Sequence, residues 1–469
     1  MKRVKISPVT RISGFMEIDA TIDNNVIIDA KTEGLLFRGF EKMLEGRSPF
    51  DAIYFTQRIC GICSAAHSLT STLALENAMG IIPSEQGRYL RDIIHACDIL
   101  QNHIRHFYQY TAPDYIRLPE GNTLFETDHN DFRLPKKKND LIVQHYFDSL
   151  DYSRNAHEML AILGGKAPHN HGIFIGGITT QATPEKIKQL CFLLKNIRDF
   201  ISQKMIPDAY TIAEYYKEYF NIGRGYGNLL TYGLFNGYEK LGTLLVNPSV
   251  YSDGKIMKLD PMEITENIYS SWYVANSDTY TPYQTIAEPS MKKVDAYSWV
   301  KAPRYRGLPY EVGPLARMWL SGEYRNGISS MDRTLARVLE AKKIADIVFT
   351  LLNNLIPGVS VQKEYIVPKS AQGAGLTDTA RGALGHWIKI EDSVISLYQI
   401  ITPSAWNLST RSEDNLPGPG EKALIDTIIN DSSSPVESGR TIRSFDPCVS
   451  CATHVYSNGN LIKTMQVVP

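Results

Sequence analysis

Two Cys-x-x-Cys pairs hold four of the six cysteines in this 469-residue chain. Cys60 and Cys63 lie near the start of the chain, and Cys448 and Cys451 lie close to its end. Soft sulfur ligands suit nickel, iron and copper as well as zinc, and a thiolate can bridge two metals. If the fold brings the two pairs together, they form one four-thiolate metal site.

Two less specific interpretations of the cysteine pairs remain open. A structural zinc site usually has its pairs close in sequence, whereas nearly the whole chain separates Cys63 from Cys448. Two thioredoxin-like redox pairs are disfavoured because no βαβ pattern surrounds either pair. The remaining cysteines, Cys97 and Cys191, fall on apolar faces of predicted helices and are expected to pack in the core.

A helix is predicted directly after the first cysteine pair, because Ala65, Leu69 and Leu73 recur at helical spacing. The positive end of that helix would favour a thiolate at Cys63. His67 lies one helical turn after Cys63 and could hydrogen-bond to its sulfur. Without the cysteines, a lone histidine at this position would more often be a core residue.

The composition is that of a globular protein with a large core: 43% of the residues are hydrophobic and the formal net charge is -1. This balance gives no argument for nucleic acid or an anionic membrane surface as a partner. The cysteines are too few for a disulfide framework, so reduced thiols are expected. Neither an export signal nor an apolar run of about 18 residues is found, so any membrane association is expected to come through a partner.

The predicted elements are mainly helices with little β structure. Alternating apolar and polar residues over 16–30 predict an N-terminal β-hairpin. Apolar residues at three- and four-residue steps predict three long helices: 84–110, 183–201 and 331–355. The simplest organisation is one domain over 1–469, with a small antiparallel β segment at 1–45 integrated into it.

The residues around both cysteine pairs resemble the paired signature of the nickel-iron hydrogenase large subunit. These are Arg-Ile-Cys-Gly-Ile-Cys at 58–63 with the trailing His67, and Asp-Pro-Cys-Val-Ser-Cys-Ala-Thr-His at 446–454. The resemblance covers most of the chain and implies a helical-bundle core of the type found in those subunits. Further blocks that resemble the family lie at 8–12, 36–41, 106–108, 381–387 and 403–407.

This resemblance implies a buried nickel-iron centre whose iron carries carbon monoxide and cyanide. Cys60 and Cys448 would bind nickel terminally, while Cys63 and Cys451 would bridge nickel and iron. Buried cyanide nitrogens need hydrogen-bond donors. The residue types that could supply such donors occur at Arg381 and Ser404, in two of the matching blocks.

Other residues are expected to support the centre without binding it. Asp446 and Asp114 would hold the Arg381 guanidinium in place. Leu384 belongs to the same apolar block as Arg381 and is expected to line the cofactor. His67 also belongs to this supporting set, because it could hydrogen-bond to the Cys63 sulfur.

A second metal is implied near the C-terminus. Glu41 and His454 resemble the family's ligands to a hard divalent cation, usually magnesium, which takes oxygen ligands and tolerates an imidazole in a minority of sites. Residues 455–469 follow His454 and resemble the extension that a nickel-dependent protease removes during maturation. The alternative is a permanent terminal hairpin.

One departure from the family pattern affects proton transfer. Many members have a glutamate where this chain has Ser13. A serine hydroxyl can relay a proton but cannot hold one as a base near neutral pH. We expect Ser13 with an ordered water, or a nearby carboxylate such as Glu33, to take over this role.

The function implied is reversible heterolytic cleavage of dihydrogen. Cys448 is the first choice as proton acceptor and Arg381 the second. No cysteines remain for an iron-sulfur cluster, so an iron-sulfur small subunit is expected to carry the electrons, with maturation factors as further partners. The compartment is left open: periplasmic or membrane-associated by co-export with the small subunit, or cytoplasmic.

Two other functions belong to relatives of this family. One is the quinone-binding subunit of respiratory complex I, which has no nickel; retention of all four cysteines argues against it. The other is a regulatory hydrogenase that senses dihydrogen, and the C-terminal extension argues weakly against that role.

Overall fold

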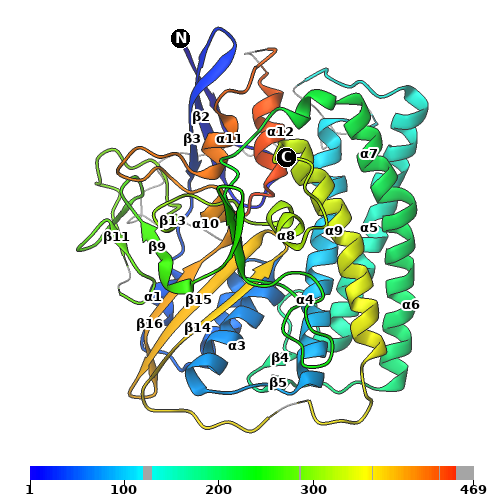
Figure 1. The fold of residues 1–469 in the computed structure, drawn as a ribbon, viewed down its shortest axis with the longest axis vertical. Coiled ribbons are helices and arrows are strands. Elements are labelled where there is room, and N and C mark those ends of the chain that lie inside the picture. The colour runs from blue at the N-terminus through cyan, green and yellow to red at the C-terminus, as the bar shows by residue number, and fades with distance from the viewer. Residues whose placement is uncertain (120–128, 285–286, 362, 432–433, 450–469) are drawn as a thin grey trace.

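The fold is mainly helical, with several small antiparallel sheets beside a helical bundle (Figure 1). The bundle confirms the predicted fold class, and α4 lies within it against both α5 and α9. Its members are α4 (Glu85–Arg105), α5 (Lys136–Gly164), α6 (Pro184–Phe200), α7 (Ile206–Tyr215) and α9 (Ser330–Asn353). The computed structural model describes residues 1–119, 129–284, 287–361, 363–431 and 434–449.

Side-chain caps fix the starts of the three predicted helices. Ser84 accepts a hydrogen bond from Gly87 at the start of α4, and Thr183 accepts one from Lys186 at the start of α6. Ser329 and Asp332 form a capping box at the start of α9. These caps confirm the predicted helix starts to within two residues.

The long helix predicted at 84–110 is α-helical only in its first part. The α-helix stops at Arg105, and the chain continues through a π-helical turn (His106–Thr111) and a 3-10 turn (Ala112–Asp114). Such insertions often occur at functional sites. Asp114, the last residue of the 3-10 turn, is buried directly after these insertions.

The predicted N-terminal hairpin is present as part of a three-stranded antiparallel sheet. Strands β2 (Met16–Asp23) and β3 (Val26–Gly34) are joined through Asn24 and Asn25, both with positive φ, as a tight two-residue hairpin turn favours. Strand β1 (Lys2–Ile6), which the sequence did not reveal, pairs with β2.

A second sheet packs against the helix that follows the first cysteine pair. Strands β14 (Ala371–Thr379), β15 (Gly382–Glu391) and β16 (Val394–Ile401) form an antiparallel meander on α3 (Ser64–Met79). A Cβ atom at Gly375 would lie 2.0 Å from the carbonyl oxygen of Thr70, so only glycine permits this approach.

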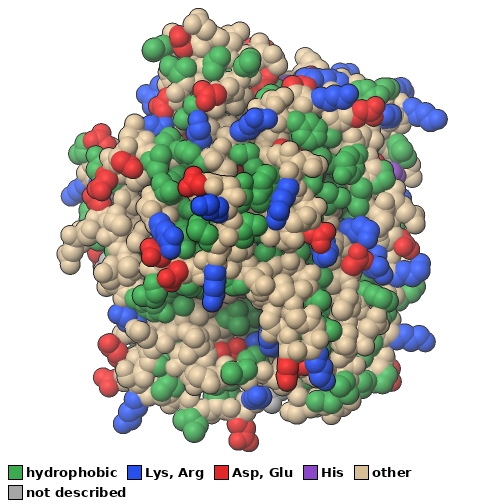
Figure 2. Space-filling view, in the orientation of Figure 1, with side chains coloured by type: hydrophobic (Ala, Val, Ile, Leu, Met, Phe, Trp, Pro, Cys, Tyr) green, Lys and Arg blue, Asp and Glu red, His purple; other side chains and the backbone are tan. Residues whose placement is uncertain are grey.

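Among the described residues, no helix combines the length and apolar character that a membrane span needs. Basic and acidic side chains are interspersed on the face shown in Figure 2. The shorter α-helices and strands that complete the fold are α1 (Phe40–Leu44), α2 (Asp51–Phe55), β4 (Ile173–Phe174), β5 (Gly177–Ile178), β6 (Leu229–Thr231), β7 (Ser249–Ser252), β8 (Lys255–Lys258), β9 (Ile264–Asn267), β10 (Tyr273–Val274), β11 (Thr279–Tyr280), β12 (Glu288–Pro289), β13 (Ala302–Tyr305), α8 (Pro314–Ser321), α10 (Pro403–Asn407), α11 (Pro419–Leu424) and α12 (Val436–Ser444).

Candidate metal centre

Three cysteines from opposite ends of the chain meet inside the protein. The sulfur atoms of Cys60, Cys63 and Cys448 all lie within 4.8 Å of one another, and those of Cys60 and Cys448 are 3.4 Å apart. All three residues are buried, and none of them forms a disulfide within the described residues. The convergence expected of the two pairs is therefore present for three cysteines, while Cys451 lies outside the described residues.

The first cysteine loop is held by two side chains, one from the segment between β3 and α1 and one from α4. Arg38 donates to the carbonyl oxygens of Arg58, at 2.7 Å, and Ile59, which immediately precede Cys60. Gln101 of α4 donates to the carbonyl oxygen of Ile62 at 2.9 Å. The loop ends at Cys63, the N-cap of α3, as the sequence predicted.

The second cysteine loop is held by backbone contacts with the N-terminal segment. Ser13 forms a parallel β-bridge with Cys448, and the Ser13 N–H donates to the carbonyl oxygen of Pro447 at 3.1 Å. The hydroxyl oxygen of Ser404 accepts from the Cys448 N–H at 3.0 Å. An accepting hydroxyl keeps its own proton, so Ser404 can still donate to a bound ligand.

Arg381 is buried next to the thiols and keeps one unused donor. Its Nε donates to the Asp446 carbonyl oxygen at 3.0 Å and lies 3.1 Å from Asp446 Oδ1. Its Nη2 donates to Asn102 Oδ1 at 2.9 Å, while Nη1 is buried without a hydrogen-bond partner among the described residues. A buried, unpartnered N–H fits a ligand with an acceptor atom.

The electrostatics of this pair keep both groups ionised. Burial by itself would raise the pKa of Asp446, but Arg381, followed by His106 and Arg337, lowers it to about 2. Burial also opposes the charge of Arg381, yet Asp446 and the nearby sulfurs raise its pKa well above the usual range.

Asp114 does not hold Arg381, and that expectation was wrong. Both its carboxylate oxygens bind Arg443, at 2.6 and 2.7 Å, and Arg11 Nη2 lies 2.6 Å from Oδ1. Asn102, which the sequence gave no reason to select, occupies the place next to Arg381. Asn102 lies in α4, one helical turn before the π-helical turn begins at His106, whereas Asp114 lies in the 3-10 turn that follows the π-helical turn.

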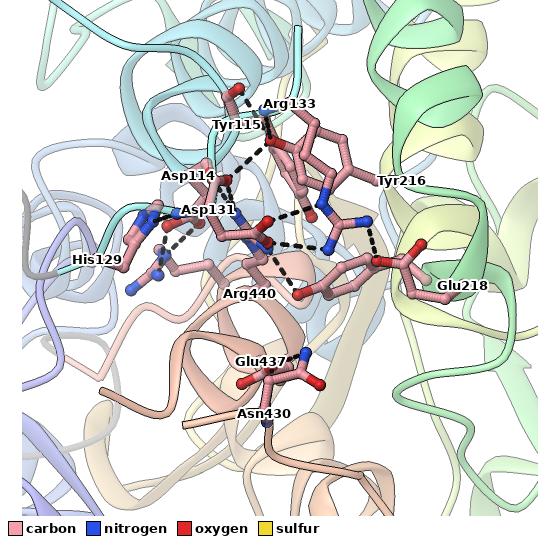
Figure 3. A network of polar contacts seen from close by, with 12 residues as sticks. Asp114, Tyr115, His129, Asp131, Arg133, Tyr216, Glu218, Asn430, Glu437 and Arg440 are labelled. Atoms are coloured by element: carbon pink, nitrogen blue, oxygen red, sulfur yellow. Dashed lines mark hydrogen bonds and ion pairs between the residues drawn. The ribbon is translucent and has the colours of Figure 1, made fainter. Parts of the chain in front are cut away.

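The carboxylate of Asp114 belongs to a network that anchors α12 (Figure 3). Arg440, one turn before Arg443 on α12, donates to Asp131 Oδ2 at 2.6 Å and to the Asp114 carbonyl oxygen. The Arg440 guanidinium also lies over three tyrosine rings, those of Tyr115, Tyr216 and Tyr219, at 4.6, 5.0 and 5.2 Å. Because α12 leads directly into the second cysteine loop, these contacts set the position of Cys448.

His67 begins a buried chain of hydrogen bonds. Its Nδ1 lies 3.1 Å from His386 Nε2, and His386 Nδ1 lies 2.8 Å from the Tyr398 hydroxyl, which donates to Ser71 at 3.1 Å. Burial lowers the pKa of His67 to about 4, against an opposing effect of Cys448. His67 is therefore neutral near pH 7, and its bond to the Cys63 sulfur stays a prediction.

Glu41 lines a small cavity of about 70 Å³ together with Glu266 and Lys301, and most of the other lining residues are apolar or aromatic. Lys301 Nζ lies 3.3 Å from both Glu41 carboxylate oxygens and 3.6 Å from Glu266. Burial is the main cause that raises the pKa of Glu266 to about 7. The other expected cation ligand, His454, lies outside the described residues.

Two remaining residues of the expected set are also placed. Leu384 packs in the same buried cluster as the three thiols, together with Ala66. Glu33 lies in the N-terminal sheet, where Lys5 Nζ is 3.1 Å from its carboxylate. Of the two candidates for proton transfer, the structure places Ser13 directly beside Cys448.

Comparison with known proteins agrees with this arrangement. Residues 38–123, 121–327 and 320–454 match the family described as Nickel-dependent hydrogenase. The chain therefore belongs to the nickel-dependent hydrogenase family.

Within that family it corresponds to the large, catalytic subunit. It is 33% identical to the periplasmic NiFeSe hydrogenase large subunit of Desulfomicrobium baculatum, over 97% of this chain and 95% of the relative. It is 30% identical to the Hydrogenase-1 large chain of Escherichia coli, over 99% and 97%. The solved Ni-Fe-Se hydrogenase from D. vulgaris Hildenborough in the reduced state superposes with a TM-score of 0.93 at 37% identity, covering 97% of this chain and all of that one.

Proposed function

We propose that this chain binds a nickel-iron centre through Cys60, Cys63, Cys448 and Cys451 and catalyses reversible heterolytic cleavage of dihydrogen. The observation that carries the proposal is the buried group of three thiols beside Arg381 Nη1, which has no hydrogen-bond partner within the described part of the chain. A structural zinc site needs only its four ligands and gives no reason for a buried cationic donor at its edge.

The donors around the thiols fit an iron that carries carbon monoxide and cyanide. Arg381 Nη1 and the hydroxyl proton of Ser404 are both available next to the cysteine cluster. Cyanide nitrogens accept hydrogen bonds, and a buried acceptor without a donor would be costly. Leu384 lines the same cluster and gives carbon monoxide an apolar neighbour.

When bound, the centre supplies a Lewis acid that polarises dihydrogen. Cys448 is the proposed proton acceptor. Arg381 is less suitable because its ion pair with Asp446 keeps the guanidinium protonated, so it donates rather than accepts. Ser13 then relays the proton from Cys448, since it lies beside that residue, while Glu33 is engaged by Lys5.

A hard divalent cation, magnesium or one like it, is proposed at Glu41 and His454. The Glu41 carboxylate lines a small cavity, and carboxylate oxygens are ligands that such a cation prefers. Glu266 offers a second carboxylate beside it, and Lys301 balances the two charges. His454 would join this site from the end of the mature chain.

The name large subunit implies a partner subunit. With four of six cysteines in the metal centre, Cys97 and Cys191 cannot bind an iron-sulfur cluster in this chain. We infer that an iron-sulfur small subunit accepts the electrons. We also infer that maturation factors, and a protease that cleaves after His454, act on this chain before it becomes active. Residues 1–454 would then form a single mature domain, and any membrane association would come through partners.

Infrared spectroscopy and metal analysis of the purified protein test the proposal. Absorption bands of iron-bound carbon monoxide and cyanide, with nickel present, are expected. Zinc without these bands would overturn it. The quinone-binding alternative would show neither nickel nor the bands, whereas a dihydrogen sensor would show both but little turnover.

A further inference from the structure

Ser13 lies in the loop that joins β1 to β2, residues 7–15. Two residues of this loop have left-handed backbone conformations, Arg11 with a φ of 55° and Gly14 with a φ of 97°. Glycine adopts this conformation freely, whereas a residue with a side chain stays there only when its surroundings hold it. The contacts of the Arg11 side chain therefore bear on the position of Ser13.

The Arg11 guanidinium binds two groups beyond the end of α4. Its Nη1 donates to the carbonyl oxygen of Tyr110 in the π-helical turn, at 3.0 Å. Its Nη2 donates to Asp114 Oδ1 in the 3-10 turn, at 2.6 Å. The side chain is 27% exposed, so burial alone does not hold it in place. Because a guanidinium is planar and rigid, the two bonds fix its orientation as well as its location.

Asp114 also binds the helix that leads to the other partner of the Ser13–Cys448 bridge. Its two carboxylate oxygens accept from Arg443 of α12, the helix before the second cysteine loop. The third nitrogen of Arg443, Nη1, donates to the carbonyl oxygen of Thr10 at 3.4 Å. One carboxylate is therefore a common anchor for the loop that carries Ser13 and for the helix that leads to Cys448.

The other contacts of this loop are less directional. Val9 and Val449 belong to the same apolar cluster, which draws the loop toward the second cysteine loop but sets no precise distance. Proton transfer through a hydroxyl needs heavy atoms within about 2.6–3.2 Å of each other. Charge-assisted hydrogen bonds supply the directional hold that apolar packing lacks. The bond from Arg11 to Asp114 is of this kind.

We propose that Arg11 is a positioning residue for proton transfer, which holds the Ser13 hydroxyl at relay distance from Cys448 through its bond to Asp114. This inference rests on the proposed relay by Ser13. Neither of the two Arg11 contacts described above involves a cysteine. Loss of the Arg11 guanidinium should therefore slow proton transfer while the metal centre stays intact.

The test uses the complete, nickel-loaded enzyme with Arg11→Met, a side chain of similar length without charge or donors. Turnover is expected to fall several-fold and the solvent isotope effect to change. Nickel per chain and the infrared bands of the centre should stay the same. Amide hydrogen exchange in residues 9–15, measured by mass spectrometry, is expected to become faster because the loop has lost its anchor. Arg443 still occupies both oxygens of Asp114, so the variant is expected to fold.

Two further variants separate positioning from a general structural effect. In a Ser13→Ala background, Arg11→Met is expected to cause no further loss of turnover, because both changes act on one step. Independent, additive losses would overturn the proposed role. Arg11→Lys keeps the charge next to Asp114 but not the planar pair of donors, so intermediate turnover is expected. It also serves if the methionine variant does not fold.

Arg47→Met is the matched control. Arg47 likewise donates to one backbone carbonyl oxygen, that of Met43 at 2.7 Å, and lies 4.0 Å from Asp51. Its loss is expected to leave turnover and the exchange of residues 9–15 unchanged. Normal turnover in nickel-loaded Arg11→Met, beside a slow Ser13→Ala, would overturn only the role of Arg11. Normal turnover in Ser13→Ala would instead reject the proposed relay itself, so the two failures are distinguishable.

Discussion

Arg443 and Asp114 form a two-point ion pair, with Nη2 2.6 Å from Oδ1 and Nε 2.7 Å from Oδ2. The pair joins α12, which leads into the second cysteine loop, to the 3-10 turn Ala112–Asp114. It is almost completely buried, and Arg11 adds a third cationic contact. The stability of the protein should therefore depend on the charge of Asp114.

Asp114→Asn is expected to lower the free energy of unfolding by about 3 kcal/mol at pH 7, because it leaves buried guanidinium groups without their anion. Burial alone would raise the pKa of Asp114, but Arg11 and Arg443 lower it below the unfolded-state value of about 4. The stabilisation is therefore present above about pH 4 and is lost as the pH falls toward the folded-state pKa. Urea unfolding at several pH values measures this.

The control is Asp140→Asn, which removes an exposed ion pair with Lys136. A change below about 0.5 kcal/mol is expected there. Equal effects of the two variants at pH 7 would contradict the importance of the Arg443–Asp114 pair.

Cys448→Ser is expected to remove nickel from the purified protein, because a hydroxyl is a poor ligand for this soft site. Nickel per chain, measured by elemental analysis, reports the loss. Cys191→Ser replaces a partly buried cysteine outside the cluster and is expected to retain nickel. Full nickel content in the Cys448→Ser enzyme would show that the metal binds elsewhere.

Ser13→Ala is expected to lower turnover at least about tenfold and to change the solvent isotope effect, because a proton relay is lost. Nickel content and the infrared bands should stay unchanged, since Ser13 contacts the second cysteine loop through its backbone. Ser7→Ala, an exposed hydroxyl near the same segment, serves as the comparison. Unaltered turnover and isotope effect in Ser13→Ala would exclude the relay.

Glu41→Gln is expected to lose the divalent cation while keeping nickel, because a neutral amide is a weaker ligand for magnesium than a carboxylate. The amounts of magnesium and nickel per chain, measured together by elemental analysis, test this prediction. Glu45→Gln changes an exposed carboxylate at the end of the same helix and should retain both metals. Magnesium retained in Glu41→Gln would place the cation site elsewhere.

Mass spectrometry of the active protein is expected to find His454 as its last residue. Protein produced without nickel should keep residues 455–469, since the processing proposed here depends on the metal. An active enzyme with an intact extension would contradict this prediction and favour a permanent terminal segment.

Local patterns in the sequence were enough for three of the five bundle helices and for the cysteines, whereas α5 and α7 were not predicted. The starts of α4, α6 and α9 follow from capping residues and apolar spacing, which act over a few positions. The cysteine pairs could be joined into one site because their chemistry is specific. These parts of the fold and site were predictable.

Pairings between distant polar residues were not predictable in the same way. Asp114 could have paired with any of several arginines, and the π-helical turn that directs it to Arg443 has no clear sequence signal. Asn102 and Lys301 look like ordinary polar residues in the sequence. Only their burial next to Arg381 and Glu41 reveals their roles.

The bridge between Ser13 and Cys448 has a consequence for synthesis. A ribosome releases Cys60 and the N-terminal sheet long before the second cysteine loop emerges. Domains generally begin to fold from the N-terminal side during translation. Cys448 can therefore join Cys60 and Cys63 only after nearly the whole described chain has been synthesised, so the thiol cluster forms late.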